Sequence, residues 1–224
     1  MADPALMKKA LLLYSSAIAA IGLLFFISAG TLDYPQAWAY MAVLFIPALF
    51  VGLYFLKNNP EFLERRFKMK EKEARQALIQ KASALVFIIG FLLPGLDRRF
   101  GWSSVPFEIS LLADAIVFLG YLVCFLVFKE NSYAGRTIRV EKGQTVISTG
   151  LYSIIRHPMY FGIALLYLPT PIALGSLIAF PAFLLVIPIL VFRILNEEEV
   201  LRRELPGYSE YCGKVRYRLI PHVW

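Results

Sequence analysis

The sequence contains few of the residues on which metal sites, disulfide frameworks and soluble nucleotide-binding domains depend. Only two cysteines, Cys124 and Cys212, and two histidines occur in 224 residues. So few candidates support neither a disulfide framework nor a zinc site with the usual ligand spacing. The G-x-G-x-x-G loop of soluble dinucleotide-binding folds is also missing. Charged residues make up 17% and hydrophobic residues 58% of the chain, which excludes an ordinary soluble domain.

Charge is missing altogether from the 32-residue run Phe161–Phe192. This run is too long for one membrane crossing and about right for two short ones. Two prolines and a glycine at 169–175 mark the point at which the chain would reverse. Such a helical hairpin brings Arg156–His157 and Glu197–Glu199, which flank the run, to the same membrane face. We therefore expect chemistry where these two polar groups meet.

Four more apolar segments precede the hairpin, at Ala10–Gly30, Gln36–Leu56, Leu78–Leu96 and Val105–Phe128. The first has the basic flank of a signal peptide, but its apolar run is longer than a signal core, so we interpret it as a retained helix. The predicted fold class is all-α, a polytopic membrane helix bundle of about six spans, or five if the hairpin is one kinked helix. We expect a four-span region at 1–128 and a second region at 129–224, with the hairpin at 158–195 and cytoplasmic tail helices.

The basic residues are distributed unevenly over the loops. Six spans with both termini in the cytoplasm place 21 of the 23 Lys and Arg residues inside and only Arg98 and Arg99 outside. This agrees with the positive-inside rule, whereas five spans would put the basic tail outside. The net charge of +7 is therefore explained by topology rather than by nucleic acid. The sequence predicts an integral membrane protein with both termini and the active site in the cytoplasm.

The segments outside the spans have distinct compositions. Asn59–Gln76 carries both signs of charge and some apolar residues, so it is either a helix on the headgroup layer or a solvated loop. The β-branched runs Thr137–Val140 and Thr145–Ser148 surround a turn, which predicts a short β-hairpin. In the tail, a proline–glycine break separates two predicted helices, Glu197–Leu205 and Tyr208–Tyr217.

Several polar residues near the hairpin are candidates for chemistry. Pro158 suits the first helical position, and the amides of Met159 and Tyr160 would then be free donors able to hold a carboxylate. The structural alternative is that His157 only caps the helix and Arg156 anchors it to lipid headgroups.

Acidic residues form a second group of candidates. Arg193 and Glu197 lie four residues apart, so they share a helix face and could simply form an ion pair. The adjacent carboxylates of Glu197–Glu199 repel one another, and a nearby cation or a ligand rich in donors, such as a ribose, would relieve them. Asp114 lies inside an apolar segment, where an acid is either functional or a hydrogen-bonded member of the bundle.

From residue 150 onward the chain carries an ordered set of motifs. The stretch from Gly150 to Gly162 reads G-L-Y-S-I-I-R-H-P-M-Y-F-G, and R-x-x-x-E-E-x-x-L follows from Arg193. P-G-Y-x-x-Y-x-x-x-V then begins at Pro206, and L-I-P ends the set at Pro221. Their order and spacing resemble the isoprenylcysteine carboxyl methyltransferase family over roughly residues 137 to 221. One departure is L-P-G at 205–207, where many relatives have a Phe-Gly-acidic turn.

The resemblance implies a membrane methyltransferase that binds S-adenosylmethionine between the signature loop, the hairpin and the tail. Residues 129–224 would then be its cofactor-binding methyltransferase region. Carried over by position, the cofactor-binding residues would be Gln144, Thr145, Val146, Ile147, Tyr152, His157, Pro158, Met159, Tyr160 and Glu197. Arg193 would face the methyl acceptor, and with Arg156 and Glu198 it forms the candidate catalytic set.

The methyl acceptor stays open at this point. A carboxylate of the isoprenylcysteine type, delivered sideways from the bilayer, is already nucleophilic and needs no base. A phospholipid amine or a small thiol is the alternative, and an amine would need a proton acceptor such as Glu198 or Tyr208. Two further classes are a membrane reductase that uses NADPH and a non-enzymatic transporter with Asp114 on its pathway. The expected partners are membrane lipids and a lipidic or small-molecule acceptor, with no metal and no nucleic acid.

Overall fold

The computed structural model describes residues 3–67, 74–134 and 140–224, and within these ranges it contains helices and loops but no strand. The helices are α1 (Pro4–Ala29), α2 (Pro35–Asn58), α3 (Pro60–Arg66), α4 (Ala74–Phe100), α5 (Phe107–Glu130), the short 3-10 helix η1 (Gly150–Ser153), α6 (Pro158–Tyr167), α7 (Thr170–Ala173), α8 (Phe180–Leu184), α9 (Val186–Glu204) and α10 (Tyr208–Lys214). The predicted all-α class is confirmed.

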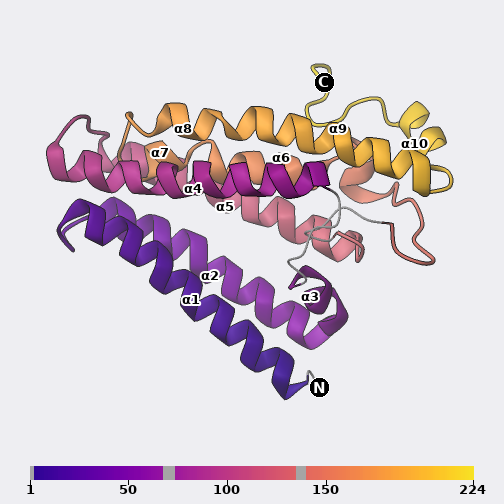
Figure 1. Cartoon of the computed structure of the whole chain (residues 1–224), viewed down its shortest axis with the longest axis horizontal. Coiled ribbons are helices and arrows are strands. Elements are labelled where there is room, and N and C mark those ends of the chain that lie inside the picture. The colour runs from indigo at the N-terminus through magenta and orange to yellow at the C-terminus, as the bar shows by residue number, and fades with distance from the viewer. Residues whose placement is uncertain (1–2, 68–73, 135–139) are drawn as a thin grey trace.

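The long helices form two layers (Figure 1). Helices α1 and α2 pair with each other and lie against a second layer, in which α4, α5, α6–α7 and α8–α9 run side by side. Contact between α5 and α6 is close because two glycines meet there. A Cβ atom on Gly162 would lie 2.7 Å from Cys124 Sγ, and one on Gly120 would lie 2.8 Å from the Gly162 carbonyl oxygen. The glycines therefore fix the start of α6 against α5.

Four segments are long and apolar enough to cross a membrane: α1, α2, α5 and Phe180–Glu204, which comprises α8 and α9. They agree with four of the six predicted spans. α6 and α7 form a shorter apolar unit, Pro158–Ala173, and α4 is a 27-residue helix that packs on α1. That these two also cross the membrane remains a prediction.

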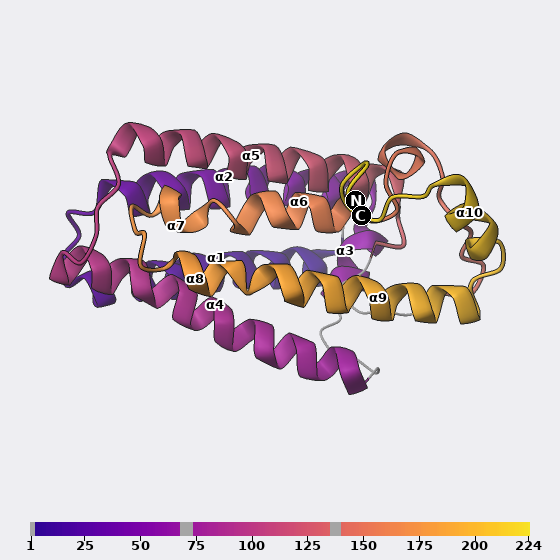
Figure 2. The same ribbon diagram turned by 90° about the horizontal axis from the view of Figure 1, so that it is seen from above.

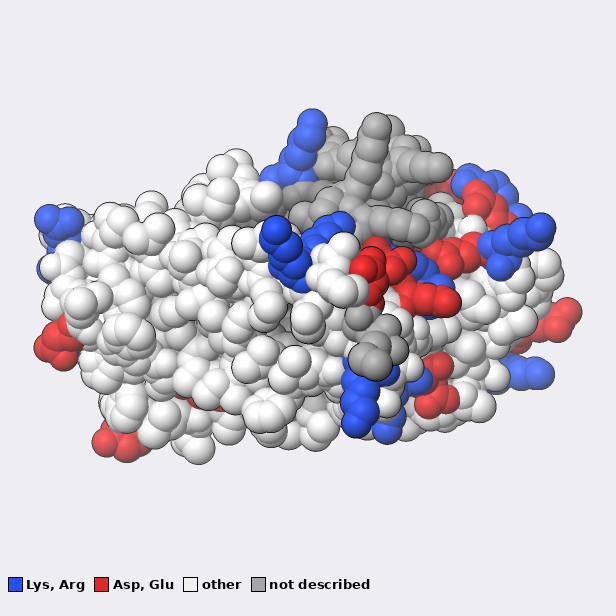
Figure 3. Space-filling view, turned by 90° about the horizontal axis from the view of Figure 1, so that it is seen from below, with Lys and Arg blue, Asp and Glu red and all other residues white. Residues whose placement is uncertain are grey.

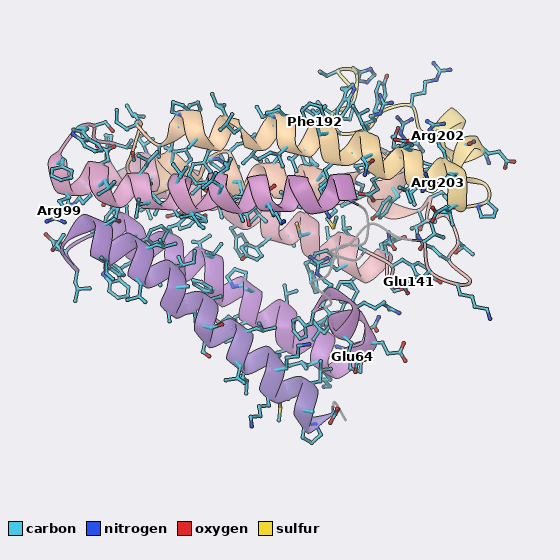
Figure 4. All side chains as sticks on the ribbon, in the orientation of Figure 1. Glu64, Arg99, Glu141, Phe192, Arg202 and Arg203 are labelled. Atoms are coloured by element: carbon cyan, nitrogen blue, oxygen red, sulfur yellow. The ribbon has the colours of Figure 1, made fainter. Side chains whose placement is uncertain are left out.

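Charged side chains gather toward the two ends of the helices and leave an uncharged band between them (Figure 3). Arg99 lies at one end, whereas Glu64, Glu141, Arg202 and Arg203 lie at the other (Figure 4). We refer to the latter as the charged end. An apolar band between two polar ends is the pattern expected of a bundle that spans a bilayer.

The long apolar run folds into the predicted helical hairpin. α6 and α7 lead away from the charged end, the chain reverses, and α8 and α9 return beside them (Figure 2). Gly175 in the turn has a φ of +76°, a conformation that favours glycine. The buried carboxylate of Asp97 accepts hydrogen bonds from the hydroxyls of Ser103 and Ser176, which ties the turn to the end of α4. The reversal returns the chain to the end at which α6 began.

The loops match the predictions less closely. α3 makes the start of the first connector helical, with the Asn59 side chain accepting from the Phe62 amide at 3.2 Å. Residues 145–148 are irregular, so the predicted β-hairpin is wrong there, while 137–139 lie outside the described residues. The predicted tail helices are present as the end of α9 and as α10, although α10 ends at Lys214.

Candidate cofactor-binding site

A pocket lies at the charged end of the bundle, where segments distant in the sequence meet. It is formed by residues 131–134 directly after α5, the loop at 140–149, η1, the start of α6, and by α9 and α10. Its lining residues are Asn131, Tyr133, Ala134, Gln144, Thr145, Val146, Ile147, Tyr152, Arg156, His157, Met159, Tyr160, Arg193, Glu197, Leu201, Leu205, Tyr208 and Tyr211.

The C-terminal tail pairs with the segment that precedes α6. The Arg156 amide donates to the Tyr217 carbonyl and the His157 amide to the Arg218 carbonyl, both at 2.9 Å. The Arg156 guanidinium also donates to the carbonyl of Val215 at 3.2 Å. These backbone contacts hold the tail beside the pocket.

Glu198 joins the three segments electrostatically. Its side chain is buried, and its Oε1 lies 2.8 Å from Arg156 Nε and 3.2 Å from His157 Nε2. Its Oε2 accepts a hydrogen bond from Arg218 Nε at 3.1 Å and lies 3.8 Å from Arg202. A buried carboxylate is stable only when it is paired in this way. Glu198 therefore fixes the signature segment, α9 and the tail relative to one another.

Its neighbour Glu197 faces the pocket instead. Arg193 Nε donates to the Tyr160 hydroxyl at 3.0 Å, and that hydroxyl donates to Glu197 Oε2. The three side chains thus form a continuous hydrogen-bonded row along one wall of the pocket. Charge-assisted hydrogen bonds of this kind are stronger than neutral ones, so the row is held in place before any ligand binds.

Tyrosines from α10 close the other side. The Tyr211 hydroxyl donates to the Tyr152 carbonyl at 2.7 Å, and the side-chain Nδ2 of Asn131 donates to the Tyr152 hydroxyl at 2.9 Å. Tyr208 is buried, yet its hydroxyl has no hydrogen-bond partner among the described residues. Burial, and secondly the charge of Glu198, raise the pKa of Tyr208, so this phenol stays protonated at neutral pH and acts as a donor.

The structure brings together most of the residues predicted for the site. Every predicted residue lines the pocket except Pro158, which is buried at the start of α6, and Glu198, which lies behind the wall. The Tyr160 amide is not the free donor expected, because it donates to the His157 carbonyl at 3.1 Å. Asp114 is buried within α5 and does not line the pocket.

The sequence did not predict that the following six residues line the pocket: Asn131, Tyr133, Ala134, Leu201, Leu205 and Tyr211. A seventh lining residue, Tyr208, was considered only as a base. Leu201, Tyr208 and Tyr211 stand in the motifs, so their spacing was the available signal. The connector residues 131–134 carry no such signal, because they reach the pocket only through the way the loop folds back.

Comparisons with known proteins bear on this pocket. Residues 109–206 match the family model described as "PEMT: Phospholipid methyltransferase". The structure of the eukaryotic intramembrane Ras methyltransferase ICMT (isoprenylcysteine carboxyl methyltransferase) has a similar fold, with a TM-score of 0.57 and 19% identity over 96% of this chain and 77% of that chain. The likeness to this structure concerns the fold, and the family model covers less than half of the chain. The matched region contains the hairpin and most of the pocket.

A curated relative with a different described activity also matches part of the chain. The Delta(14)-sterol reductase TM7SF2 of Mus musculus is 28% identical over 152 residues, which cover 54% of this chain and 36% of the reductase. The chain thus spans about a third of the length of this curated relative.

The chemistry of the lining fits an S-adenosyl group, which combines a ribose diol, an aromatic base, a carboxylate and a cationic sulfonium. The carboxylate of Glu197 suits hydroxyls or a positive charge, while Arg193 and His157 suit a carboxylate. Tyrosine rings suit a flat base or a cation. The unpartnered hydroxyl of Tyr208 is a donor that such a ligand would satisfy.

Proposed function

We propose that this chain transfers a methyl group from S-adenosylmethionine to an acceptor delivered from the membrane, best a carboxylate of the isoprenylcysteine type. The strongest support is that Arg193, Tyr160 and Glu197 form one hydrogen-bonded row in a pocket within a region that matches a methyltransferase family model. The charged end would face the cytoplasm, where the soluble cofactor is available, because the basic loops lie there.

S-adenosylmethionine supplies an electrophilic methyl group on a cationic sulfur. Glu197 and Tyr160 would hold its polar groups, and Arg193 would orient the acceptor carboxylate through two parallel hydrogen bonds from its planar guanidinium. Alignment of two reactants in this way contributes on the order of 7–11 kcal/mol in favourable cases. Closure of the apolar wall, which includes Ile147 and Leu201, would exclude water and strengthen these contacts.

The surroundings of Glu198 favour a carboxylate over an amine acceptor. An amine loses a proton when it is methylated, and Glu198 and Tyr208 were the two predicted bases. Burial raises the pKa of Tyr208, so its phenol is already protonated at neutral pH. Glu198 lies behind the pocket wall, surrounded by Arg156, His157 and Arg218. In the proposed mechanism Glu198 is therefore a positioning residue, and Arg156 is held by it at the pocket wall.

Two other functions have specific support. The family description favours a phospholipid amine as the acceptor. The likeness to the sterol reductase favours reduction by NADPH at the same pocket.

Isotope labelling separates these functions. The purified chain in nanodiscs made from bacterial lipid extract, supplemented with prenylcysteine, is incubated with S-adenosylmethionine that carries a deuterated methyl group, and the products are analysed by mass spectrometry. The proposal predicts label on the prenylcysteine carboxylate. Label on phosphatidylethanolamine would establish the amine alternative. Absence of label, together with oxidation of NADPH when a sterol with a Δ14 double bond is supplied, would replace the proposal by the reductase.

A further inference from the structure

The short helix α3 lies at the charged end of the bundle, next to the end of α5 (Figure 1). None of its residues, all of which the structure describes, lines the cofactor pocket. Phe62 and Leu63 are buried, and the centroid of the Phe62 ring lies 4.5 Å from that of Phe55 in α2 and 5.3 Å from that of Phe128 in α5. A helix of this length is not stable alone, so these contacts hold it in place. They attach α3 firmly to two long helices.

Arg66, the last residue of α3, connects this helix to the pocket. Its Nη1 donates to the carbonyl oxygen of Ala134 at 2.9 Å, and Ala134 is a buried residue that lines the pocket. Its guanidinium lies 4.3 Å from the centre of the Phe128 ring and 5.8 Å from that of Phe62. The two rings hold the cation in a defined place, so its hydrogen bond fixes the position of the Ala134 carbonyl.

A weaker contact joins α3 to a second segment of the pocket. Arg65 Nη1 lies 3.8 Å from Glu141 Oε2, and both side chains are partly exposed. The Glu141 amide donates to Gln144 Oε1 at 2.9 Å, and Gln144 lines the pocket. A partly exposed ion pair contributes little to stability, whereas a hydrogen bond from a charged group to a buried carbonyl contributes more. We therefore expect Arg66 to have the larger influence on the pocket.

We propose that α3 supports the wall of the cofactor pocket and that Arg66 is a positioning residue, which holds residues 131–134 through the Ala134 carbonyl. The inference rests on the proposed function for the identity of the ligand, and it adds a residue outside the matched region 109–206. Asn131 of the same segment donates from Nδ2 to the Tyr152 hydroxyl, so a shift of the segment also reaches Tyr152. A wall that is ordered before binding raises the affinity, because the ligand does not have to order it.

Hydrogen–deuterium exchange of the purified chain in nanodiscs, without any ligand, tests this support directly. We expect Arg66→Gln to speed up deuterium uptake several-fold in peptides that contain residues 131–134, because the Ala134 carbonyl loses its donor and the segment opens more often. Lys8→Gln, which removes a charge from an exposed position of α1, is the control and should not change this uptake. Equal uptake in Arg66→Gln and in the unchanged chain would overturn the proposal.

Calorimetric titration with S-adenosylhomocysteine measures the consequence for binding. Arg66→Gln should bind it about 2–10-fold more weakly, which is the loss expected when one hydrogen bond is removed. Arg66→Lys keeps a cation near the Phe128 ring and a donor for the carbonyl, so it should regain most of the affinity. A loss in Arg66→Lys as large as in Arg66→Gln would contradict the role of the Ala134 contact.

A variant of the neighbouring arginine compares the two contacts of α3. Arg65→Gln removes the partly exposed ion pair with Glu141 and should affect both deuterium uptake and affinity less than Arg66→Gln does. A larger effect of Arg65→Gln on both measurements would refute the assignment of the supporting role to Arg66.

The two measurements separate this inference from the proposed function. If the unchanged chain binds no S-adenosylhomocysteine, the proposed function fails, and hydrogen–deuterium exchange alone decides whether Arg66 holds residues 131–134. If the unchanged chain binds S-adenosylhomocysteine and Arg66→Gln binds it equally well, the positioning role fails and the proposed function stands.

Discussion

Glu198→Gln is the substitution that most sharply tests how the site is held together. The change keeps the shape of the side chain and removes its charge. Arg156 Nε at 2.8 Å, which is buried, and Arg218 Nε at 3.1 Å, which is partly exposed, then lose their counter-ion. Removal of one partner from a buried ion pair costs about 3–5 kcal/mol. We expect the free energy of unfolding to fall by about that amount, because the cation of Arg156 stays buried.

The assay has two readings that report on different parts of the structure. Denaturant titration in mild detergent, followed by circular dichroism, gives the stability, and limited trypsin digestion gives the release of the tail. We expect faster cleavage in the tail after Arg216 and Arg218, because the tail loses its ionic contact with α9. Glu210→Gln, which removes one carboxylate charge from an exposed position of α10, is the matched control and should have little effect. Unchanged stability and unchanged cleavage in Glu198→Gln would refute the role of Glu198 as the joining residue.

Three further substitutions have defined outcomes. Gly162→Leu places a Cβ atom 2.7 Å from Cys124 Sγ and should destabilise the bundle by about 1–3 kcal/mol in thermal unfolding. The control Gly52→Leu, whose Cβ atom meets no other atom within 4 Å, should not destabilise it. Equal stabilities of the two variants would contradict the close α5–α6 packing. Tyr208→Phe should weaken S-adenosylhomocysteine binding by about 2–10-fold in calorimetry, which is the loss in affinity expected when one hydrogen bond is removed. An unchanged affinity would mean that the hydroxyl does not contact the ligand. Arg193→Lys should keep the affinity for the cofactor and lower kcat, because lysine lacks the planar guanidinium that can hold a carboxylate through two parallel hydrogen bonds. A loss of cofactor affinity as large as the loss of kcat would mean that Arg193 contacts the cofactor rather than the methyl acceptor.

The helical hairpin could be predicted from the sequence because its signals are local. A long run without charged residues is stable only inside the membrane or a protein core. The prolines and the glycine at 169–175 mark the one point in this run at which the chain can reverse. The position of Glu197 in the motif also allowed the prediction that this carboxylate of the triplet Glu197–Glu199 faces the pocket. Because adjacent residues of a helix point in different directions, Glu198 faces away from the pocket, toward Arg156.

Other features depend on contacts that no local pattern encodes. The pairing of 156–157 with 217–218 joins backbone groups about sixty residues apart, so the partners of Glu198 were not visible in the sequence. The β-branched run at 145–148 was interpreted as a strand, yet strand propensity requires a partner edge. Here Thr145, Val146 and Ile147 line the pocket instead.

Calorimetric titration with S-adenosylhomocysteine of the wild-type chain and two variants tests the central claim most directly. The claim is that the pocket beside Glu197 holds the cofactor and that the mid-bundle acid Asp114 does not. We predict one site per chain, several-fold weaker binding in Glu197→Gln and unchanged binding in Asp114→Asn. Binding that survives Glu197→Gln and disappears in Asp114→Asn would place the cofactor elsewhere in the bundle and contradict the account.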